Sequence, residues 1–202
     1  GANGQLGRSI YVELPPYFYV IPCININKKG AELFENSEIS VDISNSNDVQ
    51  STFQKFSPDV VINSAAFTNV DQCETDKDTA FKVNVKGLKN LVKFSSKTTH
   101  IIQISTDYVF DGEKGDYSEF DPTYPKSYYG KTKLEAENYL RGTDYNWLIL
   151  RPNVLFGNNL KSNSSFVSWV YNSLKQNKQI NVVTDQISNP TWTTAFAQAI
   201  RQ

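Results

Sequence analysis

Short apolar runs alternate with longer amphipathic stretches along most of the chain. The apolar runs predict strands at residues 18–24, 60–63, 100–105, 147–151 and 180–183, and the helical spacings predict helices at residues 5–13, 46–56, 76–96, 128–141 and 164–176. Strand and helix therefore alternate, which is typical of βαβ units in a mainly parallel sheet. We expect a doubly wound α/β fold with helices on both faces of the sheet.

One segment breaks this alternation. Residues 111–126 are rich in Asp, Gly, Tyr and Pro and have no clear period, so we expect a long loop just before a helix. Long loops in compact domains often carry function.

The composition excludes several classes of function. The 20 Lys and Arg residues balance the 21 Asp and Glu residues, so we expect no nucleic-acid or anionic-membrane partner. Cys23 and Cys73 cannot form a disulfide framework, and a single histidine, His100, predicts no metal site. No apolar run approaches the roughly 18–20 residues that cross a bilayer, and we expect no signal peptide. We expect a cytoplasmic protein, and a truncated N-terminus because the chain starts at Gly1 and lacks methionine.

A glycine-rich segment opens the chain. Gly1, Gly4 and Gly7 are spaced three apart and precede a stretch that can form a helix. Such a loop lets backbone N–H groups approach a pyrophosphate at a helix N-terminus, and its last glycine permits close packing of helix on strand. The same spacing also arises by chance in turns, and the strand that usually precedes the motif is missing from this sequence.

Two further segments bear on a dinucleotide. Asp42 and Ile43 lie in a turn where an adenine amino group can be recognised, although a helix cap is the alternative for Asp42. Residues 25–29 read Asn-Ile-Asn-Lys-Lys and lack the acidic residue that binds a ribose 2′-hydroxyl. This absence favours tolerance of NADP.

Tyr129 and Lys133 form the strongest candidate for catalysis. Their spacing of four places both on one face of a helix, one turn apart. A nearby ammonium, together with a cationic nicotinamide, stabilises a phenolate and lowers the pKa of a tyrosine from about 10. Tyr129 can then pass a proton to a carbonyl oxygen. Tyr128 is the competing residue, but Thr132 stands four residues after it; a surface helix with no catalytic role remains the alternative.

A hydroxyl group follows the third predicted strand. Ligands of open α/β sheets gather at the carboxyl ends of strands, so Thr106 is well placed to hydrogen-bond a substrate carbonyl. Ser105 is the second choice, and a turn-capping role is the alternative for either residue.

Four segments together resemble the dTDP-4-dehydrorhamnose reductase family of extended short-chain dehydrogenases. They read GANGQLG at residues 1–7, VINSAAFTNVD at 61–71, STDYVF at 105–110 and YGKTKLEAE at 129–137, and the resemblance extends to residues 185–186 and 189–191. The resemblance implies a Rossmann-like domain with NADPH or NADH, a nucleotide-sugar substrate and reduction of the 4-keto group of dTDP-4-dehydro-L-rhamnose. It also allows a homodimer.

The resemblance also implies roles for individual residues. Thr106, Tyr129 and Lys133 would be catalytic, Lys133 would also hold the nicotinamide ribose, and Thr106 and Asp107 would face the sugar nucleotide. The implied cofactor contacts are Gly1, Gly4, Gln5, Leu6 and Gly7 at the diphosphate, Asp42 and Ile43 at the adenine, and Ala65, Ala66 and Phe67 at the ribose, with Tyr129 and Lys133. We expect residues 1–150 to form the cofactor-binding domain with the catalytic residues, and residues 151–202 to begin an interleaved, incomplete substrate-binding region.

Two departures limit what the resemblance implies. Related 4,6-dehydratases have an Asp-Glu pair after the threonine, whereas this chain has Asp107 and Tyr108, so dehydration is not expected. The family usually reads Arg-Thr-Ser-Trp-Val-Tyr where residues 151–156 read Arg-Pro-Asn-Val-Leu-Phe, so Val154 replaces an aromatic that touches the nucleotide-sugar. Two other functions stay open: an NADP-binding regulatory subunit that resembles the beta subunit of methionine adenosyltransferase, and an NDP-sugar epimerase.

Overall fold

The computed structural model describes residues 1–25, 34, 39–157 and 165–202. The chain forms two compact units, which we describe separately. The first comprises Gly1 and residues 23–29 and 39–151, and the second comprises residues 2–22, 30–38 and 152–202. The domain division expected at residue 150 stays a prediction. Residues 26–29, from which we predict tolerance of NADP, lie outside the described part.

Parallel strands form the frame of the first unit. The longer sheet has the order β3-β4-β5, and a second, short sheet pairs β1 with β2. All of these pairs are parallel, with Val60 opposite His100 and His100 opposite Asn146. The bounds are β1 Cys23–Ile24, β2 Ile39–Ser40, β3 Val60–Asn63, β4 His100–Ile104 and β5 Asn146–Leu150. The predicted class of parallel sheet with alternating helices is confirmed.

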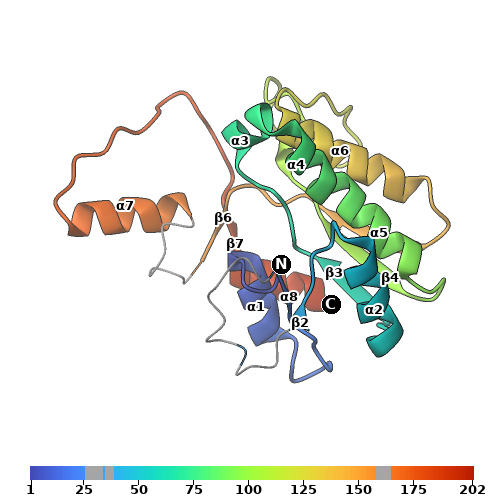
Figure 1. The fold of residues 1–202 in the computed structure, drawn as a ribbon. Helices are drawn as coiled ribbons and strands as arrows, with labels where there is room; N and C mark the ends of the chain where they lie inside the picture. Colours follow the sequence, from blue (N-terminus) through green and yellow to red (C-terminus); the bar gives the residue numbers. More distant parts are fainter. Residues whose placement is uncertain (26–33, 35–38, 158–164) are drawn as a thin grey trace. The chain divides into compact units, whose positions relative to one another are not determined.

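Helices cover this sheet through apolar clusters. Leu88 of α5 and Leu140 of α6 pack with Ile101 of β4, while Val49 of α2 and Leu91 of α5 form a neighbouring cluster. Helices α5 and α6 lie side by side in Figure 1. The bounds are α2 Ser46–Phe56, α3 Val70–Thr75, α4 Lys77–Phe81, the π-helical turn η1 Lys82–Lys86, α5 Gly87–Phe94, the 3₁₀ turn η2 Asp107–Val109 and α6 Tyr128–Arg141.

The second unit contains α1, α7 and α8 with one pair of short parallel strands. Ser9 of α1 donates a hydrogen bond to Thr193 of α8 (2.9 Å), and Glu13 of α1 pairs with Arg201 of α8 (3.4 Å). The bounds are α1 Gln5–Glu13, β6 Leu155–Phe156, α7 Phe166–Lys175, β7 Thr191–Trp192 and α8 Thr193–Arg201. Among the described residues, no helix combines the length and apolar character needed to cross a membrane.

The structure corrects several predicted elements. The strand predicted at 18–24 contains only Cys23 and Ile24, and the helix predicted at 76–96 is divided by η1. Residues 180–183 form no strand, because no described segment pairs with them and Val183 is 61% exposed. Helices α3 and α8 and the two-residue strands β2, β6 and β7 were not predicted.

Asn84 of η1 joins three parts of the first unit. Its carboxamide oxygen accepts the Phe67 N–H (2.8 Å), and its amide donates to the Phe67 carbonyl (3.1 Å) and to the Thr132 hydroxyl of α6 (2.9 Å). Asn84 is buried, so these bonds replace those that water would otherwise provide. A single π-helical turn is often found at functional sites. Asn84 therefore fixes the loop after β3 against the helix that carries Tyr129.

Gly130 lets α6 approach the 3₁₀ turn η2. A Cβ at this position would lie 2.2 Å from the Tyr108 carbonyl oxygen, which no rearrangement of a flexible side chain can relieve. The helix begins at this contact, where the Ser127 hydroxyl accepts the Gly130 N–H (3.1 Å). A glycine between Tyr129 and Lys133 is thus required for the packing of the site.

We expect Gly130→Ala to lower the free energy of unfolding by about 1–3 kcal/mol, because the added methyl group overpacks the contact with Tyr108. Urea unfolding followed by circular dichroism measures this loss. Gly142→Ala is the matched control, since its Cβ would meet only ordinary contacts at 3.5 and 3.6 Å. Equal stability of the two variants would contradict the close approach of α6 and η2.

We expect Asn84→Ala to cost about 1–3 kcal/mol of stability, because the buried Phe67 N–H loses its acceptor. Asn90→Ala provides the comparison, since among the described residues the Asn90 amide donates a single hydrogen bond, to the Ile43 carbonyl (2.9 Å). Thermal unfolding should place Asn84→Ala well below Asn90→Ala. The reverse order would show that the Asn84 bonds do not hold the loop.

Candidate active site

The predicted site residues of the first unit follow the carboxyl ends of its parallel strands. Asp42 and Ile43 come after β2, residues 64–67 come after β3, and Ser105 and Thr106 come after β4. This is the edge at which open α/β sheets bind ligands. A Cβ on Gly1 would lie 2.5 Å from the Ala65 nitrogen, so only glycine fits against the loop after β3.

Helix α6 brings Tyr129 and Lys133 to the same edge. Tyr129 is 8% exposed and Lys133 is 3% exposed, so both lie on the buried face of the helix. Tyr128, the competing tyrosine, lies under the Lys77 ammonium (5.4 Å from the ring centre), and its N–H is bound by Glu74 (2.6 Å). This arrangement favours Tyr129 as the candidate acid.

The Thr106 side chain faces Tyr129 and also organises its own turn. Its hydroxyl donates to Asp107 (3.1 Å) and accepts the Tyr108 N–H (3.2 Å), which makes Thr106 the N-cap of η2. The capping role, considered as the alternative, is therefore present. Thr106 still lies at the strand end and close to the tyrosine, because it lowers the pKa of Tyr129 against the effect of burial. Ser105, the second choice, is buried, and its N–H donates to the Leu150 carbonyl (2.7 Å).

Burial raises the pKa of Tyr129 to about 12, a rise that the hydrogen bond with Thr106 opposes and the charge of Asp107 increases. The protein groups alone thus keep Tyr129 a neutral phenol, whereas we expected Lys133 and a cationic nicotinamide to lower its pKa. Burial also raises the pKa of Asp107. Both groups are placed in surroundings that favour the protonated form.

Lys133 is held at the end of β4. Its ammonium donates a hydrogen bond to the Ile104 carbonyl (2.6 Å). Burial lowers the pKa of Lys133 to about 8, and the negative charge of Glu137 opposes this decrease. Lys133 therefore stays mostly protonated at neutral pH, as a donor at the strand end.

A chain of buried amides connects Lys133 with the loop after β3. The Gln103 amide donates to the same Ile104 carbonyl (2.8 Å), and its oxygen accepts from the Asn63 amide (2.7 Å). The Asn63 oxygen in turn accepts the Ala65 N–H (3.2 Å). We did not predict Gln103 or Asn84 as site residues; a polar side chain inside an apolar strand, as at Gln103, is the signal that marks such a residue.

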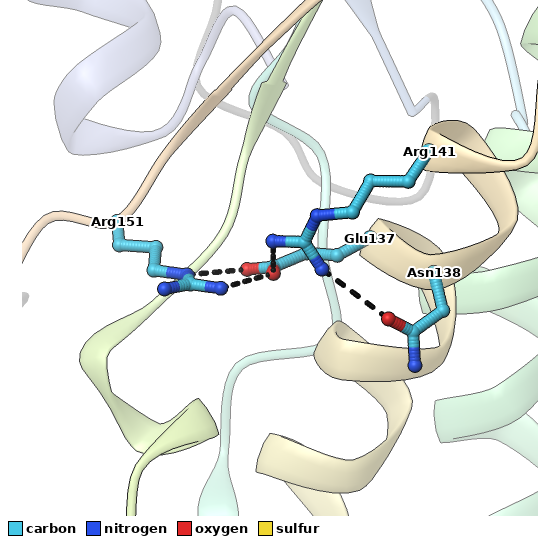
Figure 2. Close-up of polar contacts among 4 residues, drawn as sticks. All are labelled: Glu137, Asn138, Arg141 and Arg151. Carbon is cyan, nitrogen blue, oxygen red and sulfur yellow. Dashed lines mark hydrogen bonds and ion pairs between the residues drawn. The ribbon is translucent and has the colours of Figure 1, made fainter. Parts of the chain in front are cut away.

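Glu137 is a further residue that we did not predict. Its carboxylate accepts two hydrogen bonds from Arg151 (2.9 and 2.7 Å) and one from Arg141 (2.8 Å), as Figure 2 shows. Burial alone would raise the pKa of Glu137, but the hydrogen bonds from Arg151 and the charges of both arginines hold it below its ordinary value. The spacing of four from Lys133 is the signal that could have identified it.

The remaining predicted residues fall into two groups. The Asp42 carboxylate accepts the N–H (2.9 Å) and the hydroxyl (2.7 Å) of Ser44, which is a local turn. The N-cap of α2 is Asn45, so the helix-cap alternative for Asp42 is wrong, and adenine recognition stays a prediction. Gly4 to Gly7 belong to the second unit, where Gly4 is the N-cap of α1 and Leu6 and Gly7 are buried. Within the described ranges, no three His, Cys, Asp or Glu residues are grouped to hold a metal ion.

Known proteins match this chain over its whole length. The dTDP-4-dehydrorhamnose reductase of Aggregatibacter actinomycetemcomitans is 35% identical, over 100% of this chain and 65% of that protein. The crystal structure of dTDP-4-dehydrorhamnose reductase from Bacillus anthracis in complex with NADP is 32% identical and superposes with a TM-score of 0.84, over 99% of this chain and 66% of that one. Subunit beta of methionine adenosyltransferase 2 from Bos taurus is 32% identical, over 100% of this chain and 60% of that protein.

These matches establish the fold class and the family of the chain. The chain spans 60% to 66% of the length of these proteins. The Rossmann-like fold class is confirmed, and so is the resemblance seen in the motifs. The family model described as the RmlD substrate binding domain matches residues 1–202, and the chain therefore belongs to this family.

Proposed function

We propose that the chain supplies the cofactor-binding and catalytic part of an NAD(P)H-dependent reductase. Its substrate would be a nucleotide-activated deoxysugar, and the enzyme would reduce the 4-keto group of that sugar. The specific substrate we propose is dTDP-4-dehydro-L-rhamnose, and the product is dTDP-L-rhamnose. The observation that carries this proposal is the grouping of Thr106, Tyr129 and Lys133 at the carboxyl end of β4. The names of the reductases that the chain resembles support the same reaction.

The residues present fit a dinucleotide. Gly1 lies against the loop after β3, and a side chain at Gly1 would collide with the Ala65 nitrogen. Lys133 offers a buried ammonium to ribose hydroxyls, as the family resemblance implies, and Ala65 to Phe67 would line the same ribose. Gly4 to Gly7 would meet the diphosphate, and Asp42 and Ile43 the adenine. When bound, the cofactor supplies a hydride to the sugar carbon.

The side chains of the site would supply the proton that the carbonyl oxygen takes up. Tyr129 is a neutral phenol in these surroundings, so it can donate its proton to the carbonyl oxygen as negative charge develops there. The Thr106 hydroxyl would hydrogen-bond the same oxygen and orient it. The ammonium of Lys133 would stabilise the phenolate left on Tyr129 until a proton from solvent restores it. Asp107 would face the sugar nucleotide beside Thr106.

One observation favours a second function. The match to a methionine adenosyltransferase subunit covers the whole chain, so a regulatory subunit that binds NADP without turnover is the other candidate. Retention of Thr106, Tyr129 and Lys133 together favours catalysis. An epimerase would change the sugar without net consumption of NADPH.

We expect the purified protein to consume NADPH with dTDP-4-dehydro-L-rhamnose, and Tyr129→Phe to lower kcat by about 10²- to 10⁴-fold, because it removes the acid but keeps the ring. NADPH absorbance measures the rate, across a panel of 4-keto nucleotide-sugars. Fluorescence titration should show that the variant still binds NADPH.

Tyr128→Phe is the matched control for this variant, since it makes the same change one residue earlier and should keep the wild-type rate. Tight NADPH binding by the wild type with no turnover on any substrate of the panel would favour the regulatory subunit. Equal rates for Tyr129→Phe and Tyr128→Phe would exclude Tyr129 as the acid.

A further inference from the structure

We propose that Glu137 is a positioning residue for this site, which fixes α6 against the strand ends and places a buried negative charge one helical turn from Lys133. Glu137 is fully buried, one helical turn after Lys133 on the same face of α6. The role in cofactor binding rests on the proposed function, whereas the effect on Lys133 does not.

The geometry ties the catalytic helix to two strands. Arg151 directly follows β5 and binds both carboxylate oxygens of Glu137, and its guanidinium lies over the Phe110 ring (5.0 Å), just after η2. A two-pronged contact of this kind fixes direction as well as distance. Lys133, on the same helix face, is bound to the last carbonyl of β4, at Ile104. Glu137 and Lys133 thus anchor α6 at the ends of adjacent parallel strands.

A purely structural role does not account well for this cluster. The free energy needed to remove an ion pair from water is often as large as the free energy gained from its attraction. Apolar residues of similar size would therefore stabilise the same contact equally well. The Arg151 side chain is 12% exposed and Glu137 is fully buried, whereas Arg141 is 38% exposed. A buried carboxylate is useful where a nearby group must stay charged, and Lys133 is such a group.

The charges around Lys133 define the expected effect. The charge that acts on Lys133 is that of Glu137; Arg141 and Arg151 pair with Glu137, and Asp107, after β4, acts on Tyr129. The charge of Glu137 raises the pKa of Lys133 against the larger effect of burial. Since the pKa of Lys133 is about 8, removal of the carboxylate moves the titration into the neutral range and leaves less ammonium at pH 7–8.

The test measures the titration of Lys133 directly, by ¹³C NMR of protein labelled at the lysine Cε, with the signal assigned from its loss in Lys133→Met. We expect Glu137→Gln to lower the titration midpoint by about one pH unit, a tenfold change in the protonation equilibrium. The ammonium fraction then falls about fivefold at pH 8, so NADPH affinity should weaken about fivefold at that pH and change little at pH 6.

Three further variants distinguish an effect of the Glu137 charge from a loss of folded structure. Glu137→Asp should restore most of the wild-type midpoint, because it keeps the carboxylate. Glu135→Gln, which changes an exposed carboxylate on the same helix, should leave the midpoint unchanged. Arg141→Gln, at a partly exposed side chain, should raise the midpoint because Glu137 is then less neutralised. This last variant keeps the test decisive if Glu137→Gln does not fold.

The outcomes distinguish this inference from the proposed reductase function. Wild-type titration in both Glu137→Gln and Arg141→Gln would overturn the role of Glu137, whatever the enzyme activity. Failure of the wild type to bind NADPH would overturn the cofactor role. A shifted Lys133 midpoint would in that case still support the electrostatic effect of Glu137.

Discussion

A lysine ammonium buried to 3% exposure has to be satisfied by fixed protein groups, because water does not reach it. In this chain the Ile104 carbonyl accepts its hydrogen bond and the Glu137 carboxylate opposes the loss of its charge. Both partners constrain α6, because the Ile104 carbonyl is at the end of β4 and Glu137 is bound to Arg151 after β5. The position of α6, which carries the candidate catalytic residues, follows from this requirement.

Further buried polar groups extend the same constraint to the loop after β3. The amides of Gln103 and Asn63 connect the Ile104 carbonyl with the Ala65 N–H, and Asn84 connects Phe67 with α6. Fully satisfied networks of this kind specify one arrangement, although each member adds little net stability. The chain thus places polar groups in its interior where they connect the candidate cofactor loop with the candidate catalytic residues.

Much of this frame could be predicted from local pattern. The strand at Val60–Asn63 has the predicted bounds because it is a short apolar run between turn residues. The helices at Ser46–Phe56 and Tyr128–Arg141 have the predicted bounds because each combines a helical period with an N-cap. The two-residue strands β2 and β7 carry no period and form only through a partner far along the chain.

Some residues of the candidate site could likewise be predicted from local pattern, and others could not. Spacing along one helix was enough to bring Tyr129 and Lys133 together, and the position after a strand was enough to add Thr106. Asn84 and Glu137 were missed because their roles depend on partners distant in the sequence, at Phe67 and Arg151. The high pKa of Tyr129 also required the structure, since it results mainly from burial.

A crystal structure of the protein with NADP and dTDP-rhamnose tests the central claim most directly. We predict that the sugar O4 lies within hydrogen-bonding distance, about 3 Å, of the Tyr129 and Thr106 hydroxyls, with the Lys133 ammonium on the nicotinamide ribose. A sugar bound away from Tyr129, or a nicotinamide ribose out of reach of Lys133, would contradict this account.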